Sequence, residues 1–233
     1  MNNKEWNNYF INIQNKYDLK MSKNKPIAIL LDGKDITKSI KHDLLDESKE
    51  GFNDIFEQTI KFLSDKFNCI AISGADEVSF VFENSEKLRK LVPKGKYKAQ
   101  EIVSLFSQAF YKYFNDRYIN SPVYWHCKCL NIPKGKINSY IEYRSSTIYE
   151  AALTYFLKRK QRIRNAGRIP TVEKERMCNE VEEYQKYKPF IKGKLYLKGK
   201  QVDLKSFLEG KIIELQENER QEKIGFFDLN NFE

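Results

Sequence analysis

Two adjacent acids, Asp76 and Glu77, lie in a short turn between two apolar runs of the sequence. The runs, 69–73 and 78–82, each have the length and composition of a buried or half-buried strand bounded by turn residues. Neighbouring carboxylates repel each other and are stabilised by a counter-ion. Carboxylate oxygens are the ligands that Mg²⁺ takes in proteins. Asp76 and Glu77 are therefore candidates for a metal-dependent phosphoryl-transfer site.

A third acid, Asp32, follows another apolar run, 26–31, and is itself followed by Gly33. A buried strand that ends in Asp and Gly can hold a cation, because glycine permits a close approach of the backbone. If this strand lies beside the hairpin, Asp32 converges with Asp76 and Glu77. Two-metal nucleotidyl transfer needs such a convergence around cations about 4 Å apart. Each motif alone also fits an ordinary turn, but both together, on either side of a helix, favour the metal site.

The elements that must position these acids follow from periodicity. Apolar residues at spacings of three and four predict a helix over 52–67. Further helices are expected over 98–119 and 147–165, the last beginning with a capping box from Thr147 to Glu150. Strands are expected over 26–32, 69–74, 78–83 and 122–131. The resulting order, β-α-β-β-α-β, predicts a ferredoxin-like α/β (α+β) domain of the kind that forms a polymerase palm.

The two acidic motifs carry a resemblance to a known family. Leu31-Asp32-Gly33-Lys34, followed by SGADEVSFVF at Ser73–Phe82, resembles the tRNA-histidine guanylyltransferase family and the related 3′–5′ RNA polymerases. The similarity extends to about residue 165, through the strand Trp125–Leu130 and a helix with Tyr155-Phe156 and Arg164-Asn165. The resemblance implies a palm domain that adds nucleotides to the 5′ end of tRNA or another RNA.

The resemblance also implies roles for individual residues. Asp32 and Asp76 would hold two Mg²⁺ ions together with the backbone carbonyl of Gly33, and Glu77 would be a catalytic acid beside them. Nucleotide contacts are implied for Lys34, Lys98 and Ser104, with GTP and/or ATP as the nucleoside triphosphates. Family members also imply a homo-oligomer, a dimer or a tetramer.

The chain departs from the family at identifiable positions. A family Lys is replaced by Glu101, a family Asp is replaced by His126, and the motif His-Ile-Asn-Asn is absent. These differences favour a relative that acts on other RNA 5′ ends, or a divergent member, over strict guanylylation of histidine tRNA. Two alternatives stay open: a palm cyclase that makes cyclic nucleotides from NTPs alone, and a non-catalytic RNA-binding protein on a decayed palm.

Positive charge is concentrated towards the C-terminus. Residues 156–200 contain fourteen Lys and Arg against five Glu, which equals the net charge of +9 of the whole 233-residue chain. Such a cluster attracts phosphate backbones through counterion release. The densest part predicts RNA or triphosphate contacts by Lys158, Arg159, Arg162, Arg164, Asn165 and Arg168. Tyr184, Tyr187, Phe190 and Tyr196 interleave with later lysines and could stack on unpaired bases.

The chain is expected to form a palm-type domain over residues 1–168, with an N-terminal helix over 2–19, and a basic C-terminal extension over 169–233. In the extension we expect a helix over 171–188, a strand pair or turn near 193–199 with an edge strand over 192–200, and a helix over 203–216. With 41% apolar residues the chain can form a sizeable core.

Composition also bears on the cellular compartment. The sequence contains no apolar run near the roughly 20 residues that cross a bilayer, and its first residues lack the apolar core of a signal peptide. Four cysteines without a paired framework agree with a reducing compartment, and a cytoplasmic, non-membrane protein is expected. His126, Cys127 and Cys129 together suggest either a zinc site or, as we favour, ordinary residues of a strand.

Overall fold

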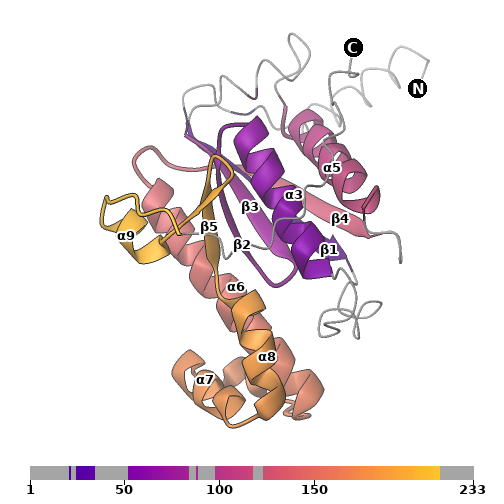
Figure 1. Cartoon of the computed structure of the whole chain (residues 1–233), viewed down its shortest axis with the longest axis vertical. Helices are drawn as coiled ribbons and strands as arrows, with labels where there is room; N and C mark the ends of the chain where they lie inside the picture. Colours follow the sequence, from indigo (N-terminus) through magenta and orange to yellow (C-terminus); the bar gives the residue numbers. More distant parts are fainter. Residues whose placement is uncertain are drawn as a thin grey trace, which may run out of the picture.

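The computed structural model describes residues 21, 25–34, 52–83, 88, 98–117 and 123–215, and the predicted N-terminal helix over 2–19 lies outside them. These residues form a six-stranded antiparallel sheet in the order β4-β1-β3-β2-β5-β6 (Figure 1). Its strands are β1 (Ile27–Lys34), β2 (Ile70–Gly74), β3 (Glu77–Phe82), β4 (Tyr124–Asn131), β5 (Lys194–Leu197) and β6 (Lys200–Val202).

The first four strands have the ferredoxin-like arrangement. Helix α3 (Phe52–Lys66) connects β1 to β2, and α5 (Ala99–Asn115) lies between β3 and β4 in the sequence. The strand order 4-1-3-2 follows because each of these two connections crosses over a neighbouring strand. The predicted α+β palm architecture is confirmed, and the four predicted strands agree with the observed ones to within two residues.

Both of these helices cover the same face of the sheet. Alternate residues of β1 and β3 point towards them and are fully buried, among them Ile29 and Phe80. The centre of this core is aromatic: Phe56 stacks on Trp125 with ring centroids 5.5 Å apart, and Phe110 meets the same indole edge-on at 4.5 Å. Each buried aromatic side chain contributes about 1.5–3 kcal/mol through loss of contact with water. The acids of interest therefore lie on a sheet that is rigidly backed from one side.

The opposite face is covered only in part. The first half of α6 (Ile137–Lys160) packs Ile141 against Ala28, Ile70 and Leu195, in a core that α9 (Leu204–Leu208) also contacts. Among the strands, α6 contacts mainly β2, and the side chains of Asp32 in β1 and His126 in β4 stay exposed at the acidic end of this face. At about 1.5 Å per residue the 24 residues of α6 extend for about 36 Å, well past the sheet.

A small helical lobe forms around the far half of α6 (Figure 1). It contains the short 3₁₀ turn η1 (Ala166–Arg168), α7 (Thr171–Asn179) and α8 (Glu182–Ile191). Leu153, Phe156 and Leu157 of α6 form its core with Cys178 and Tyr184. Lys174 is fully buried in the lobe, where its ammonium group donates to Glu150 Oε1 at 2.8 Å. The strands β5 and β6, which follow the lobe in sequence, return to the palm sheet.

Several predicted element bounds were wrong. Helix α6 begins at Ile137 rather than at Thr147, because Ile137 and Ile141 are held against the sheet. The Thr147 hydroxyl does not cap a helix; it donates to the carbonyl of Tyr143 within one. The same helix ends at Lys160, before Arg162, whose φ of 58° is left-handed.

The C-terminal predictions also need correction. The helix expected over 171–188 is split into α7 and α8, because Val181 between them is extended. The strand pair expected near 193–199 is confirmed as the hairpin β5–β6, with Lys198 and Gly199 at positive φ. The edge strand expected over 192–200 was wrong, because β5 lies inside the sheet. The helix expected over 203–216 stops at Leu208, shortly before Gly210 with a φ of 82°.

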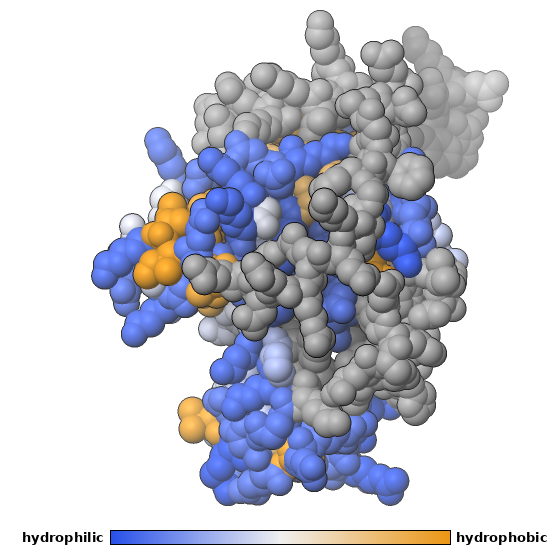
Figure 2. Space-filling view, viewed as in Figure 1, coloured by the Kyte–Doolittle hydropathy of each residue, from blue (hydrophilic) through white to orange (hydrophobic). Residues whose placement is uncertain are grey.

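No helix among the described residues is both long enough and apolar enough to span a membrane. The described residues seen in Figure 2 are largely hydrophilic, with an apolar group on the side of α9. Ile212, Ile213 and Leu215, which follow α9, are between 43% and 63% exposed.

Replacement of Gly74 by alanine should destabilise the fold. Gly74 ends β2 under α6, where an added Cβ would lie 2.7 Å from Ile148 Cγ2 and 3.2 Å from the carbonyl oxygen of Ile191. Because backbone is one of these neighbours, we expect Gly74→Ala to lower the free energy of unfolding by about 1–3 kcal/mol in urea denaturation. Gly167→Ala is the matched control, since a Cβ there meets nothing within 4 Å. Equal stability of the two variants would contradict this packing.

Candidate active site

The register of the sheet brings three side chains together at one end. Asp32 of β1 lies directly opposite Glu77 of β3 on one side and opposite His126 of β4 on the other. Directly opposed residues of an antiparallel sheet project from the same face. Because the neighbouring residue Leu31 points into the aromatic core, this is the open face, and the side chains of Asp32 and His126 are exposed.

Asp76 joins this group from the turn between β2 and β3. The Gly33 N–H donates to the carbonyl oxygen of Asp76 at 3.1 Å, which ties the end of β1 to the turn. Ala75 takes up the left-handed conformation with a φ of 51°. The predicted convergence of Asp32, Asp76 and Glu77 at one end of the sheet thus has a structural basis in the register and in this hydrogen bond.

The close acids raise one another's pKa. Burial of its carboxyl group and the neighbouring charge of Asp32 raise the pKa of Asp76 to about 7. The pKa of Asp32 is also raised, first by partial burial of the carboxyl and then by the charge of Glu77. The nearby side chains of His126, Lys128 and Arg144 act in the opposite direction on the pKa of Asp32. Bound cations would therefore relieve a repulsion that the fold has built in.

Arg144 of α6 is a site residue that the sequence prediction missed. It is only 9% exposed, its Nη2 donates to Glu77 Oε2 at 2.6 Å, and its Nε donates to Ser79 Oγ at 3.1 Å. It was missed because the helix was expected to begin at residue 147. The spacing of Ile137, Ile141 and Ile148 along one helical face was the signal that could have extended the helix backwards.

Lys128 was missed as well. It lies two residues after His126 in β4, so strand alternation places both on the open face, and the side chain is exposed. Its charge lowers the pKa of Asp32, which shows that it lies near the acids. Alternation from His126 was enough to predict this placement once the strand was recognised.

The donor set fits magnesium better than a softer metal. Asp32 and Asp76 offer carboxylate oxygens near one another, and a backbone carbonyl is available from Gly33. Glu77 is already engaged by Arg144. Within the part of the chain that the structure describes, no group of three or more His, Cys, Asp or Glu side chains is arranged to hold a metal ion. Asp32 and Asp76 are therefore the two neighbouring carboxylates that could hold a cation here.

Cys127 and Cys129 are ordinary strand residues, as the sequence favoured. They alternate with His126 and pack against the aromatic core on the opposite face of the sheet. Burial raises the pKa of each thiol to about 12, so both are protonated at neutral pH. Both thiols lie on the opposite face of the sheet from the His126 imidazole, so the three side chains do not converge.

The predicted nucleotide-binding residues are not gathered in one place. Lys34 ends β1 and pairs with Tyr124, next to the acids. Lys98 is the N-terminal cap residue of α5, and Ser104 is exposed further along this helix, where it accepts from Gln108 Nε2. The other end of α5 lies at the acidic end of the sheet, where Asn115 bonds to Val123 just before β4. Lys98 and Ser104 therefore lie about 15–25 Å along α5 from that end.

The predicted RNA-binding residues share one exposed region of the lobe. Lys158, Arg159, Arg162, Arg164, Asn165 and Arg168 are all exposed, at the end of α6 and in the segment that leads to η1. The prediction that Tyr184 and Tyr196 stack on bases was wrong. Both are fully buried, Tyr184 in the core of the lobe and Tyr196 behind the sheet.

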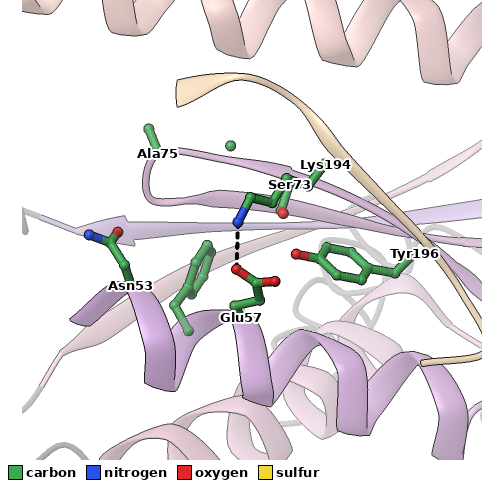
Figure 3. A pocket seen from close by; sticks show the side chains of 8 residues that line it. Asn53, Glu57, Ser73, Ala75, Lys194 and Tyr196 are labelled. Carbon is green, nitrogen blue, oxygen red and sulfur yellow. Dashed lines mark hydrogen bonds and ion pairs between the residues drawn. The ribbon is translucent and has the colours of Figure 1, made fainter. Parts of the chain in front are cut away.

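A small pocket lies behind the acidic hairpin, between α3 and the strands β2 and β5 (Figure 3). In it Lys194 Nζ donates to Glu57 Oε2 at 2.6 Å. Burial alone would raise the pKa of Glu57, but the charge of Lys194 and this hydrogen bond outweigh it and leave the pKa below its usual value. Ser73, Gly74 and Ala75 also line the pocket, so the ion pair supports the turn that carries Asp76.

Comparison with solved structures shows the same fold in known proteins. The chain is similar to a bacterial tRNA(His) guanylyltransferase (Thg1)-like protein in complex with GTP, with a TM-score of 0.55 and 15% identity over 85% of this chain and 86% of that one. It is also similar to such a bacterial protein in complex with ATP, with a TM-score of 0.54 and 16% identity over 82% and 83% of the two chains.

A third similar structure is the tRNA(His) guanylyltransferase of Saccharomyces cerevisiae, with a TM-score of 0.53 and 16% identity over 79% of this chain and 90% of that one. No protein-family model matches the sequence, and no curated protein matches it significantly. The resemblance predicted from the acidic motifs is thus confirmed at the level of the fold.

Replacement of Asp76 by asparagine should stabilise the metal-free protein at high pH. The pKa of Asp76 is about 7 in the folded protein, against an ordinary value of 3.8. Protonation of this carboxyl group at low pH therefore stabilises the folded state. This contribution is lost as the pH rises from about 4 through 7. We expect Asp76→Asn to gain about 1–3 kcal/mol at pH 8 and almost nothing at pH 4 in urea denaturation.

The control for this substitution is Asp54→Asn, in the exposed first turn of α3. It should show no gain that develops between pH 4 and pH 8. Mn²⁺ or Mg²⁺ should raise the melting temperature of the wild type more than that of Asp76→Asn. An Asp76→Asn gain that is the same at both pH values would contradict the assigned repulsion.

Loss of Arg144 should leave the negative charge of Glu77 without its counter-ion, next to the negative charge of Asp32. We expect Arg144→Ala to lower the free energy of unfolding at pH 7.5 by about 1–3 kcal/mol, less than for a fully buried pair because Glu77 is partly exposed. Adding Glu77→Gln to this variant should recover part of the loss. Arg176→Ala, which removes an exposed arginine with two exposed ion pairs, should cost less than about 1 kcal/mol. A double variant less stable than Arg144→Ala would refute the charge argument.

Proposed function

We propose that the chain is a nucleotidyltransferase that adds nucleotides to the 5′ end of tRNA or another RNA, with a nucleoside triphosphate as donor. The observation that carries the proposal is the placement of Asp32 and Asp76 together at the open end of a palm sheet. A Thg1-like fold supports the same reading, since similar structures contain GTP and ATP.

In this proposal Asp32, Asp76 and the Gly33 carbonyl hold two Mg²⁺ ions. Bound there, the ions would neutralise the triphosphate and lower the pKa of the attacking hydroxyl group. The remaining work of the protein is to position groups and to balance charge. The hydrogen bond from Arg144 fixes the position of the Glu77 carboxylate, so that Glu77 stays beside the metal ligands.

The open face provides access for substrate. Lys128 and His126 are exposed beside Asp32, and positive charge there attracts phosphate groups towards the acids. The exposed cations at the end of α6 would contact the RNA further from its reacting end. The nucleotide contacts of Lys34, Lys98 and Ser104 stay predictions. Lys34 is the best placed of the three, because Lys98 and Ser104 lie far from the acidic end of the sheet.

The proposal can be tested with purified protein, Mg²⁺, and labelled GTP or ATP. We expect extension of 5′-truncated tRNAs, seen as longer products on denaturing gels. Asp32→Asn and Asp76→Asn should each lower the rate by at least about 1,000-fold, because each removes a carboxylate that would hold the metal ions. Asp54→Asn should retain the wild-type rate.

Two other outcomes would overturn the proposal. Cyclic nucleotides formed from NTPs without RNA, detected by mass spectrometry, would identify the chain as a palm cyclase. RNA binding with no product, and no stabilisation by Mg²⁺ or Mn²⁺, would identify a non-catalytic protein on a palm fold.

A further inference from the structure

One face of α6 connects the acidic end of the sheet with the basic part of the lobe. Arg144 points from this face to Glu77 and Ser79. Residues seven, eleven and fourteen positions later return to the same face of an α-helix after about two, three and four turns. These are Ala151, Tyr155 and Lys158, and Arg159 lies beside them. The face is thus continuous from the candidate active site to the end of the helix.

The same face changes from buried to open along its length. Arg144 is covered because it lies on the sheet, whereas Ala151, Lys158 and Arg159 are exposed and Tyr155 is half-buried. The far half of α6 packs its other side, with Leu153, Phe156 and Leu157, into the core of the lobe. The turn of the acidic hairpin meets α6 at Ile148, since a Cβ at Gly74 would touch that side chain. The open part of the face therefore begins where the sheet ends.

The cations on this open surface are available for a ligand. Lys160, on the opposite side of the helix, is bound to Glu183 in an ion pair. By contrast, among the described residues none of Lys158, Arg159, Arg162, Arg164 and Arg168 forms an ion pair with an acid. The Arg159 guanidinium lies 5.8 Å from the centre of the Tyr155 ring. In Figure 2 the surface of the lobe is predominantly hydrophilic.

The chemistry of the surface favours phosphates over bases. Single-stranded RNA is held by exposed aromatic rings on which its bases stack. Among the lobe side chains that the structure describes, Phe156 and Tyr184 are buried and Tyr149 and Tyr155 are half-buried, so none of them presents an exposed ring. Arginine and lysine side chains without exposed rings instead suit the phosphate backbone and shape of a double-stranded arm.

We propose that α6 sets a minimum length for the RNA: a double-stranded arm lies along its open face, with its phosphates on Lys158, Arg159, Arg162 and Arg164 and its end at the acids. This inference rests on the proposed function. Fourteen residues of α-helix between Arg144 and Lys158 span about 21 Å. At roughly 3.4 Å of rise per base pair, the B-form value, this corresponds to about six base pairs, and the more compact A-form needs slightly more.

Binding of hairpin RNAs with different stem lengths tests the inference without any need for catalysis. Blunt hairpins with stems of 4, 6, 8, 10 and 12 base pairs, labelled at the 3′ end, are titrated with full-length protein by fluorescence anisotropy. We expect the affinity to rise at least 10-fold between 4 and 8 base pairs and to change little beyond 10. The substitution Arg159→Gln/Arg162→Gln/Arg164→Gln should abolish this step and leave binding of the 4-base-pair hairpin within about threefold.

The salt dependence provides a second readout. Removal of one cation that binds a phosphate should reduce the slope of log Kd against log salt by about 0.9 on a long duplex, so the triple variant should reduce it by about 2–3. The matched control is Lys134→Gln/Lys136→Gln/Lys205→Gln, which removes the same charge from exposed positions outside the lobe. This control should keep the length step.

Three results would overturn the inference: affinity independent of stem length, equal weakening of short and long stems by the lobe variant, or equally tight binding of unpaired RNA of the same length. Failure of the proposed function has a different signature. The length-dependent binding would persist while no RNA of any length was extended.

Discussion

Repulsion among acidic side chains at one end of the sheet is the constraint on which the site depends. The register places Asp32 opposite Glu77, and the hydrogen bond from Gly33 brings Asp76 to the same end. The cost of this arrangement shows in the raised pKa values of Asp32 and Asp76. A fold with no use for concentrated negative charge would gain stability by dispersing it.

Helix α6 supplies the positive charge that makes this arrangement tolerable. Its Arg144 reaches Glu77 because the helix lies very close to the sheet. Two glycines allow that approach: a Cβ at Gly74 would collide with Ile148, and one at Gly193 would lie 2.5 Å from Ser145 Oγ. The ion pair at the site therefore depends on the close packing of α6 against the sheet. A change that lifted the helix by the width of a methyl group would also loosen the pair of Arg144 and Glu77.

The same helix connects the acidic end of the sheet with the exposed cations of the lobe. Its first half is anchored by apolar contacts to the sheet, and its second half is the centre of the lobe. Because both halves belong to one hydrogen-bonded helix, the separation between the acids and the exposed cations is set by the helical rise. The acids and the exposed cations are thus held at a separation that neither the sheet nor the lobe would define alone.

Local patterns were sufficient for much of the palm. The strands β1, β2 and β3 contain short apolar runs, and α3 has a single apolar stripe, so their limits were predicted closely. The start of α6 was not, because the packing of Ile137 and Ile141 depends on a sheet assembled from distant segments. Arg144 was missed for the same reason, and Tyr184 looked like an exposed ring although the lobe encloses it.

The sequence by itself determined which residues could bind metal and phosphate, since acids at strand ends and clustered cations are visible in the chain. It also determined the order of strands and helices, which limits the topology to few solutions. The tertiary structure alone decided how these groups meet. Register placed Glu77 opposite Asp32, close packing on glycine brought Arg144 to Glu77, and burial removed Tyr184 and Tyr196 from the surface. Each of these outcomes depends on contacts between residues far apart in the chain, and local periodicity carries no record of them.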